Sequence, residues 1–126
     1  MTPKFFRCNR CKNIVHLVEE RGGTLVCCGE EMKELKANTS DGASEKHVPV
    51  VTVEGNKVKV VIGSVAHPML EEHHIAWIYL ETTKGGQLKY LDHTGAPEAE
   101  FALTEDEKLV AAYEYCNLHG LWKYEA

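Results

Sequence analysis

Five cysteines and seven histidines are the residues of this sequence whose types and spacing could do chemistry. Cys8-x-x-Cys11 puts two thiolates on one tight turn, and the adjacent pair Cys27-Cys28 follows after fifteen intervening residues. Four cysteine sulfurs form a closed tetrahedral site for zinc or iron, so we expect one metal ion here. Neighbouring cysteines should distort the tetrahedron, because they have less freedom to direct both sulfurs inward. The spacing does not distinguish iron from zinc, and a structural zinc site without redox work is an alternative.

The remaining cysteine and several histidines could form a second metal site. The candidate ligands are His47, His67, His73, His119 and Cys116. They lie at the ends of expected strands and in loops, where functional sites are usually built. Four imidazoles and one thiolate would leave an octahedral metal one open position, which suits iron or copper better than a structural zinc site. His73 and His74 are neighbours, so strand alternation sends them to opposite faces and at most one should bind this ion.

Two kinds of structure must position these ligands. Residues 1–36 contain four cysteines and few aliphatic residues, and a unit below roughly 40 residues usually needs a metal, a disulfide or a partner to fold. The small, polar stretch 36–44 is predicted to be a linker. After it, turn signals such as Gly55-Asn56 and Gly85-Gly86 separate strand-like segments. The expected strands are 48–53, 57–62, 74–80, 87–91, 98–103, 109–115 and 121–124.

Seven short strands at this spacing fit an antiparallel β-sandwich of immunoglobulin-like size. Pro49, near the start of the first strand, favours an edge position, and segment 109–115 could also be helical. We therefore expect a mainly β protein with two domains: a small metal-binding domain over residues 1–36 and a sandwich over residues 37–126.

Composition narrows the function classes. The 126 residues are 44% hydrophobic and 26% charged, which is typical of a folded globular chain and excludes a disordered chain or a coiled coil. The net charge of −5 disfavours a generic nucleic-acid binder. No apolar run approaches the roughly 18–20 residues of a membrane span, and no secretory signal is apparent. We therefore expect a cytoplasmic protein with no membrane or nucleic-acid partner.

Together and in this order, the motifs resemble those of desulfoferrodoxin, the two-iron class of superoxide reductase. The matching pieces cover nearly the whole chain: Cys8-x-x-Cys11 with Cys27-Cys28, Glu45-Lys46-His47-Val48-Pro49, His67-Pro68-Met69 with His73, Trp77, and Cys116-Asn117-x-His119-Gly120. The resemblance implies a desulforedoxin- or rubredoxin-like N-terminal domain with a four-cysteine iron. It also implies an immunoglobulin-like domain that carries the catalytic iron, usually in a homodimer.

The resemblance also implies a role for individual residues of the second domain. Carried over by position, the equatorial ligands of the catalytic iron would be His47, His67, His73 and His119, with Cys116 as the axial thiolate. Lys46 and Glu45 would be the catalytic pair beside the open position. One departure is Glu72, where relatives often carry a lysine; this carboxylate would make the mouth of the site less positive.

The implied activity is superoxide reduction, in which one electron and two protons convert superoxide to hydrogen peroxide at a ferrous iron without evolving oxygen. Lys46 would attract the anion and hold a water that delivers a proton. The thiolate would donate electron density to the iron, and Glu45 would take the sixth position of the ferric iron after peroxide leaves. A rubredoxin-like protein is the implied electron donor, and the four-cysteine iron would either relay electrons or only stabilise the fold.

Two other classes of protein remain open at this point. A blue-copper-like electron-transfer protein could use Cys116, His119 and Met69, although such sites contain only two histidines. A zinc-ribbon binding module fused to a sandwich, with no catalysis, is the other alternative. The ordered set of histidines and cysteine in the second domain argues against it.

Overall fold

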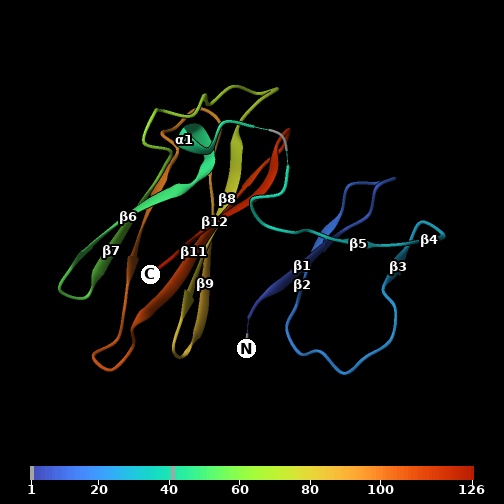
Figure 1. The fold of residues 1–126 in the computed structure, drawn as a ribbon, viewed down its shortest axis with the longest axis horizontal. Helices are drawn as coiled ribbons and strands as arrows, with labels where there is room; N and C mark the ends of the chain where they lie inside the picture. The colour runs from blue at the N-terminus through green and yellow to red at the C-terminus, as the bar shows by residue number, and fades with distance from the viewer. Residues whose placement is uncertain (1, 41) are drawn as a thin grey trace. The chain divides into compact units, whose positions relative to one another are not determined.

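The computed structural model describes residues 2–40 and 42–126. The chain divides into two compact units, the first ending at Lys36 and the second beginning at Ala37 (Figure 1). Each unit has its own sheets. No helix in the described ranges is long and apolar enough to span a membrane.

The first unit is a small β structure that carries four cysteines. Its strands are β1 (Lys4–Arg7), β2 (Ile14–Leu17), β3 (Val26–Cys27), β4 (Glu30–Glu31) and β5 (Lys33–Glu34). One antiparallel sheet has the order β2-β1-β5, and β3 pairs with β4 as a separate hairpin. Its buried hydrophobic residues, within the part of the chain that the structure describes, are Phe5, Cys8 and Met32. So few buried side chains leave much of the stability of this unit to its metal site.

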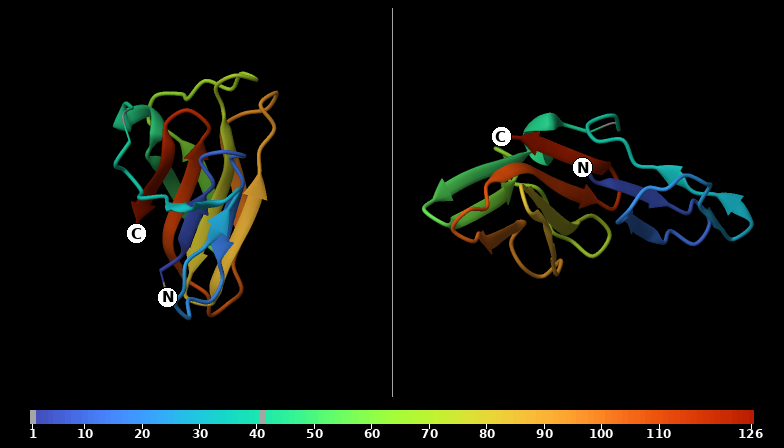
Figure 2. Two further views of the ribbon diagram at one scale, coloured as in Figure 1. Left: turned by 90° about the vertical axis from the view of Figure 1, so that its right-hand side faces the viewer. Right: turned by 90° about the horizontal axis from the view of Figure 1, so that it is seen from below.

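The second unit is the expected antiparallel sandwich, and all seven predicted strands are present. They are β6 (Pro49–Glu54), β7 (Lys57–Ile62), β8 (Ile75–Thr82), β9 (Gly85–Tyr90), β10 (Glu98–Ala102), β11 (Leu109–Cys116) and β12 (Gly120–Glu125). One sheet has the order β10-β7-β6 and the other has the order β12-β11-β8-β9. The sheets face each other, with β11 and β12 against β6 and β8 against β10 (Figures 1 and 2). Strand β6 lies at a sheet edge, as Pro49 predicts.

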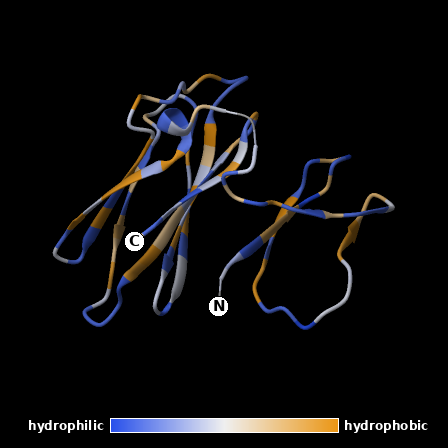
Figure 3. Cartoon of the chain, viewed as in Figure 1, coloured by the Kyte–Doolittle hydropathy of each residue, from blue (hydrophilic) through white to orange (hydrophobic). Residues whose placement is uncertain are grey.

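Alternation of side chains builds the core between the two sheets. In β7, Val58, Val60 and Ile62 are fully buried, whereas Lys57 and Lys59 are exposed. The central strand β8 contributes Ile78 and Leu80 from the opposite sheet. The hydrophobic residues of the unit follow its strands, and its hairpin turns are mostly hydrophilic (Figure 3). This core is rigid enough to fix the loops at the ends of the strands.

Three local features differ from the sequence-based expectation or refine it. The segment around His47 is a single helical turn, α1 (Ser44–His47), rather than the start of a strand. Strand β11 is extended and not helical, because it pairs with both β8 and β12. The stretch predicted to be a linker is partly held by the sandwich: the Asn38 side chain accepts a hydrogen bond from Lys123 N–H (2.9 Å) and donates one to its carbonyl (3.3 Å).

Candidate metal centres

The four cysteines of the first unit converge on one point. Their sulfurs all lie within 4.8 Å of one another. The Sγ atoms of Cys11 and Cys27 are 3.6 Å apart, and those of Cys27 and Cys28 are 4.0 Å apart. A tetrahedral ion with metal–sulfur bonds of about 2.3 Å would place neighbouring sulfurs roughly 3.8 Å apart. The group therefore fits a four-coordinate metal.

Local backbone conformation allows the adjacent cysteines to face the same point. Cys28 has a φ of 52° and Gly29 a φ of 74°, so the chain enters the left-handed region directly after β3. This conformation costs a non-glycine residue about 1–2 kcal/mol. In the first pair, the Cys11 N–H donates to Cys8 Sγ (3.4 Å), and this bond is the largest of several hydrogen bonds that lower the pKa of Cys8 to about 6. Hydrogen bonding to the other sulfurs raises the pKa values of Cys27 and Cys28, so the Cys8 thiolate is favoured first and a metal cation would favour the others.

The second candidate site lies at one end of the sandwich. The antiparallel register brings several chain segments to this end, because Pro49 pairs with Ile62 and Cys116 lies opposite both Ile75 and Gly120. The segments that meet there are α1, the β7–β8 loop (63–74) and the β11–β12 turn. They contribute, in chain order, His47, His67, His73, Cys116 and His119. The structure thus brings together all five residues that the sequence predicts for this site.

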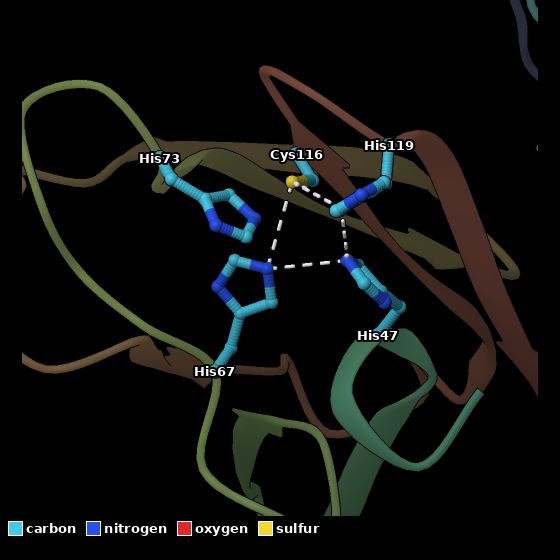
Figure 4. A group of neighbouring side chains, drawn as sticks. All are labelled: His47, His67, His73, Cys116 and His119. Atoms are coloured by element: carbon cyan, nitrogen blue, oxygen red, sulfur yellow. Dashed lines mark hydrogen bonds between the residues drawn. The ribbon is translucent and has the colours of Figure 1, made fainter. Parts of the chain in front are cut away.

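The four imidazoles form a closed ring around a common centre, and the cysteine sulfur lies to one side (Figure 4). Ring centroids are 4.7 Å apart for His47 and His67, 4.7 Å for His67 and His73, 5.0 Å for His73 and His119, and 4.7 Å for His119 and His47. Cys116 Sγ lies 3.5 Å from His67 Nε2 and 3.8 Å from His119 Nδ1. Four ring nitrogens and one sulfur therefore lie within 4.8 Å of one another.

The distances between nitrogens fit a bound metal ion. His47 Nε2 lies 3.0 Å from His119 Nδ1 and 3.2 Å from His67 Nε2. Two metal–nitrogen bonds of about 2.1 Å at a right angle would separate the nitrogens by roughly 3.0 Å. Among the residues that the structure describes, the buried His73 Nε2 has no hydrogen-bond partner. A buried polar atom without a partner that faces four other donors fits a metal ligand.

Hydrogen bonds from the opposite ring nitrogen fix the tautomer of two of the imidazoles. His47 Nδ1 donates to the Ala43 carbonyl (2.8 Å), and His67 Nδ1 donates to the Pro68 carbonyl (2.7 Å). Each Nε2 therefore carries a lone pair that points into the site. Metal-bound histidines usually have such a partner on the second nitrogen, which orients the ring and raises its basicity.

Trp122 in β12 supports two of the candidate ligands. Its ring stacks on His47 with centroids 4.9 Å apart and an interplanar angle of 22°. Its Nε1–H donates to the carbonyl of His119 (3.0 Å). Trp122 is buried and lies three residues after His119, and this closeness in sequence was the only signal that could have identified it.

Burial sets the protonation of the donors. It lowers the pKa of His67 to about 4 and also lowers the pKa values of His47 and His73, so these rings are neutral and able to bind metal at pH 7. Burial raises the pKa of the Cys116 thiol, while the N–H groups of Leu118 and His119 oppose this rise. A metal cation would favour the Cys116 thiolate further.

Two charged side chains act on the histidines. The Lys46 ammonium adds to the lowering of the pKa values of His47 and His73 by burial, whereas the Glu72 carboxylate partly opposes it at His73. Lys46 and Glu45 are exposed on α1. The turn at Gly63 packs against this helical turn so closely that a Cβ there would lie within 2.7 Å of the Lys46 carbonyl oxygen.

Two residues considered from the sequence lie outside the ligand group. His74 Nδ1 donates to the carbonyls of Leu70 and Glu71 (3.0 Å each), which agrees with its predicted orientation away from His73. Met69 Sδ accepts a hydrogen bond from Ile75 N–H (3.4 Å) and packs against the core. A blue-copper site would need Met69 beside two histidines, whereas the structure gathers four histidines without it.

Comparison with known proteins identifies relatives over both units. The family described as desulfoferrodoxin matches residues 39–125, and the family described as the desulfoferrodoxin N-terminal domain matches residues 2–35. A desulfoferrodoxin from Nitratidesulfovibrio vulgaris is 53% identical over 98% of this chain and 96% of its own length.

Solved structures of superoxide reductases also align with this chain. The superoxide reductase from Treponema pallidum aligns over 99% of this chain and 100% of its own with 46% identity and a TM-score of 0.84. A superoxide reductase from Giardia intestinalis, described as 1Fe-SOR, aligns over 65% of this chain and 97% of its own with 35% identity and a TM-score of 0.57.

Proposed function

The chain belongs to the desulfoferrodoxin family and is a superoxide reductase, and we propose that it acts through a five-donor iron site in its second unit. The ligands that we propose for the catalytic iron are His47, His67, His73, His119 and Cys116. The observation that carries this proposal is the convergence of four imidazole nitrogens and one sulfur within 4.8 Å of one another. Five such donors would leave an octahedral metal one position for a small substrate. For the second iron of the chain we propose the ligands Cys8, Cys11, Cys27 and Cys28.

When bound, ferrous iron supplies the one electron that reduces superoxide, and the product is hydrogen peroxide without evolved oxygen. His47, His67 and His73 would bind it as neutral ligands, because burial lowers the pKa values of these three imidazoles. A Cys116 thiolate would donate electron density to the bound iron and would favour electron transfer. The buried position of Cys116 keeps water away from the sulfur.

Lys46 and Glu45, which are exposed on α1, are the proposed catalytic residues. Superoxide is a small anion, so the Lys46 ammonium attracts it even though the net charge of the chain is −5, because the local field controls capture. A water held by Lys46 Nζ is the proposed source of a proton for the reduced oxygen. Glu45 would offer a carboxylate ligand to the iron once the product has left.

We further propose how the enzyme is supplied with electrons and where it works. Each turnover consumes one electron, so an outside donor must reduce the site again, and a rubredoxin-like protein is the proposed donor. We propose a homodimer as the assembly. We also propose a cytoplasmic location, because five free cysteines suit a reducing compartment.

The ligand set is tested with Cys116→Ser, prepared without oxygen. The parent protein should contain two irons per chain and show a visible thiolate absorption band from each site after mild oxidation. The variant should lose the band of the catalytic site and most of its superoxide reduction, because an alcohol donates far less electron density than a thiolate.

The control is Cys8→Ser, which should change the band of the first unit and leave that of the second. Retention of full activity and both bands in Cys116→Ser would exclude the axial role of this cysteine. One zinc and no iron in the parent protein would exclude the iron assignment itself.

A further inference from the structure

His73 is a proposed ligand whose ring, unlike those of His47 and His67, is not fixed by a hydrogen bond to a carbonyl. The rings of His47 and His67 are each fixed by an Nδ1 hydrogen bond to a carbonyl, and the His119 backbone is held by Trp122. Among residues 2–40 and 42–126, the buried His73 Nε2 has no hydrogen-bond partner. Its orientation therefore depends on the backbone that carries it.

That backbone belongs to the β7–β8 loop. Leu70 and His73 close a short turn, in which each N–H donates to the carbonyl of the other (2.9 and 3.3 Å). This turn needs an attachment to the sandwich if His73 is to stay at a fixed distance from the other ligands. Leu70 and Glu72 are exposed, so apolar packing does not provide it.

Asn117 provides the attachment from the other side of the site. Its side chain bonds to the residues that flank His73: Nδ2–H donates to the Glu72 carbonyl (3.0 Å), and Oδ1 accepts from His74 N–H (2.9 Å). Its own backbone N–H donates to the His74 carbonyl (3.2 Å). Three hydrogen bonds from one residue thus bracket His73 on both sides.

We propose that Asn117 is a positioning residue that couples the axial thiolate to the third equatorial histidine. Asn117 follows Cys116 directly and precedes His119 by two residues. Its three hydrogen bonds, called the Asn117 clasp below, therefore tie the β7–β8 loop to the segment that carries both of these ligands. The side-chain amide suits this task because it donates on one side and accepts on the other. The inference rests on the proposed ligand set, and it predicts that Asn117 controls the metal geometry without contacting the metal.

The test compares Asn117→Ala and Asn117→Asp with the parent protein in the full chain. Loss of a partner that orients a ligand typically lowers metal affinity by about 10–100-fold. We expect Asn117→Ala to release the catalytic iron to a chelator at least about 10-fold faster. Its ferric thiolate band should also shift or broaden. Asn117→Asp keeps the acceptor for His74 N–H and loses the donor to Glu72, so it should retain an intermediate share of the affinity.

Two references separate a positioning role from general destabilisation. The four-cysteine iron of the same chain is an internal standard, and its release should be unchanged. Asn38→Ala removes a comparable pair of side-chain hydrogen bonds, those to Lys123, and should lower the melting temperature without moving the catalytic band.

The possible outcomes are distinct. If Asn117→Ala folds, reduces superoxide and holds its catalytic iron as the parent protein does, with the same band, the clasp has no positioning role and the proposed function stands. If Asn38→Ala shifts the band equally, the effect is one of stability and the inference is wrong. If the parent protein binds no iron at the second site, the proposed ligand set and the inference both fail.

Discussion

At the scale of single residues, burial has opposite consequences for the two kinds of donor. It lowers the pKa of His67 to about 4 and raises the pKa of Cys116, because each neutral form is favoured away from water. The His67 ring is thereby neutral and able to bind a metal, whereas the Cys116 thiol would need a metal cation to lose its proton. The sequence motifs identified these residues, but only the fold shows which nitrogen of each ring faces the site.

Lys46 is expected to control capture of superoxide. Lys46→Ala should lower the second-order rate constant by about 10-fold at low ionic strength and weaken its dependence on salt, because a local positive charge attracts the anion. The measurement is rapid mixing of the reduced protein with superoxide at several salt concentrations.

Two variants give this experiment its controls. Glu72→Gln removes the carboxylate that acts on His73 and should raise the rate constant. Lys57→Ala removes an exposed lysine at the far end of β6 and β7, and should change little. Equal rates and equal salt dependence for Lys46→Ala and the parent protein would exclude electrostatic capture by Lys46.

Glu114 places a carboxyl group on the buried face of β11. It is fully buried, neither of its oxygens has a partner among the described residues, and burial raises its pKa to about 9. A carboxyl whose pKa is raised on folding binds more protons in the folded state, so the stability of the protein falls as pH rises from about 4.5 towards about 9.

Glu114→Gln should remove this pH dependence. The melting temperature of the variant minus that of the parent protein should increase between pH 5 and pH 8, since only the parent protein must keep a proton on this group. The comparison uses metal-free samples of both proteins. A constant difference across this range would show that Glu114 ionises without cost and would contradict the prediction.

At the scale of elements, strand β12 supports the site through Trp122. Trp122→Phe keeps an aromatic ring against His47 and removes the donor to the His119 carbonyl. Loss of a buried hydrogen bond should lower the free energy of unfolding by about 1–3 kcal/mol. Trp122→Ala should cost more, about 3–5 kcal/mol, because it also leaves a cavity. Denaturant unfolding of the iron-loaded proteins measures both, and an unchanged free energy of unfolding for Trp122→Phe would exclude a contribution from the hydrogen bond.

The elements themselves could largely be predicted from the sequence. Alternation in Lys57–Ile62 and the turn signals at Gly55 and Gly85 identify strands and hairpins, because these are local properties. The helical turn Ser44–His47 could not be predicted, since four residues show no helical periodicity. The bonds of Asn117 also could not, because they join residues about 43–45 positions apart through the sandwich.

At the scale of the whole molecule, the two candidate metal sites belong to separate units, and the two units differ in how far their folds depend on a metal. The first unit buries few hydrophobic side chains and holds its cysteines on turns, so its fold depends on the metal. The second unit has a complete core, and its metal site lies beyond the ends of strands that are already fixed. A stabilising role for the first metal follows from this difference.

Cys8→Ser should therefore separate stability from catalysis. We expect the variant to reduce superoxide at the parental rate in a single turnover, starting from chemically reduced protein. The first unit should become sensitive to proteolysis, because its four-coordinate site is incomplete. A large loss of single-turnover rate would instead assign the four-cysteine iron a direct part in the reaction.

The most direct test of superoxide reduction at the second unit is the stoichiometry of one reaction. Reduced protein is mixed without oxygen with a limiting, known amount of superoxide, and hydrogen peroxide, oxygen and oxidised iron are measured. We predict that peroxide and newly oxidised catalytic iron each equal the superoxide consumed, and that no oxygen is released. Release of oxygen equal to half of the superoxide, with no net oxidation of the iron, would show dismutation and contradict the proposed function.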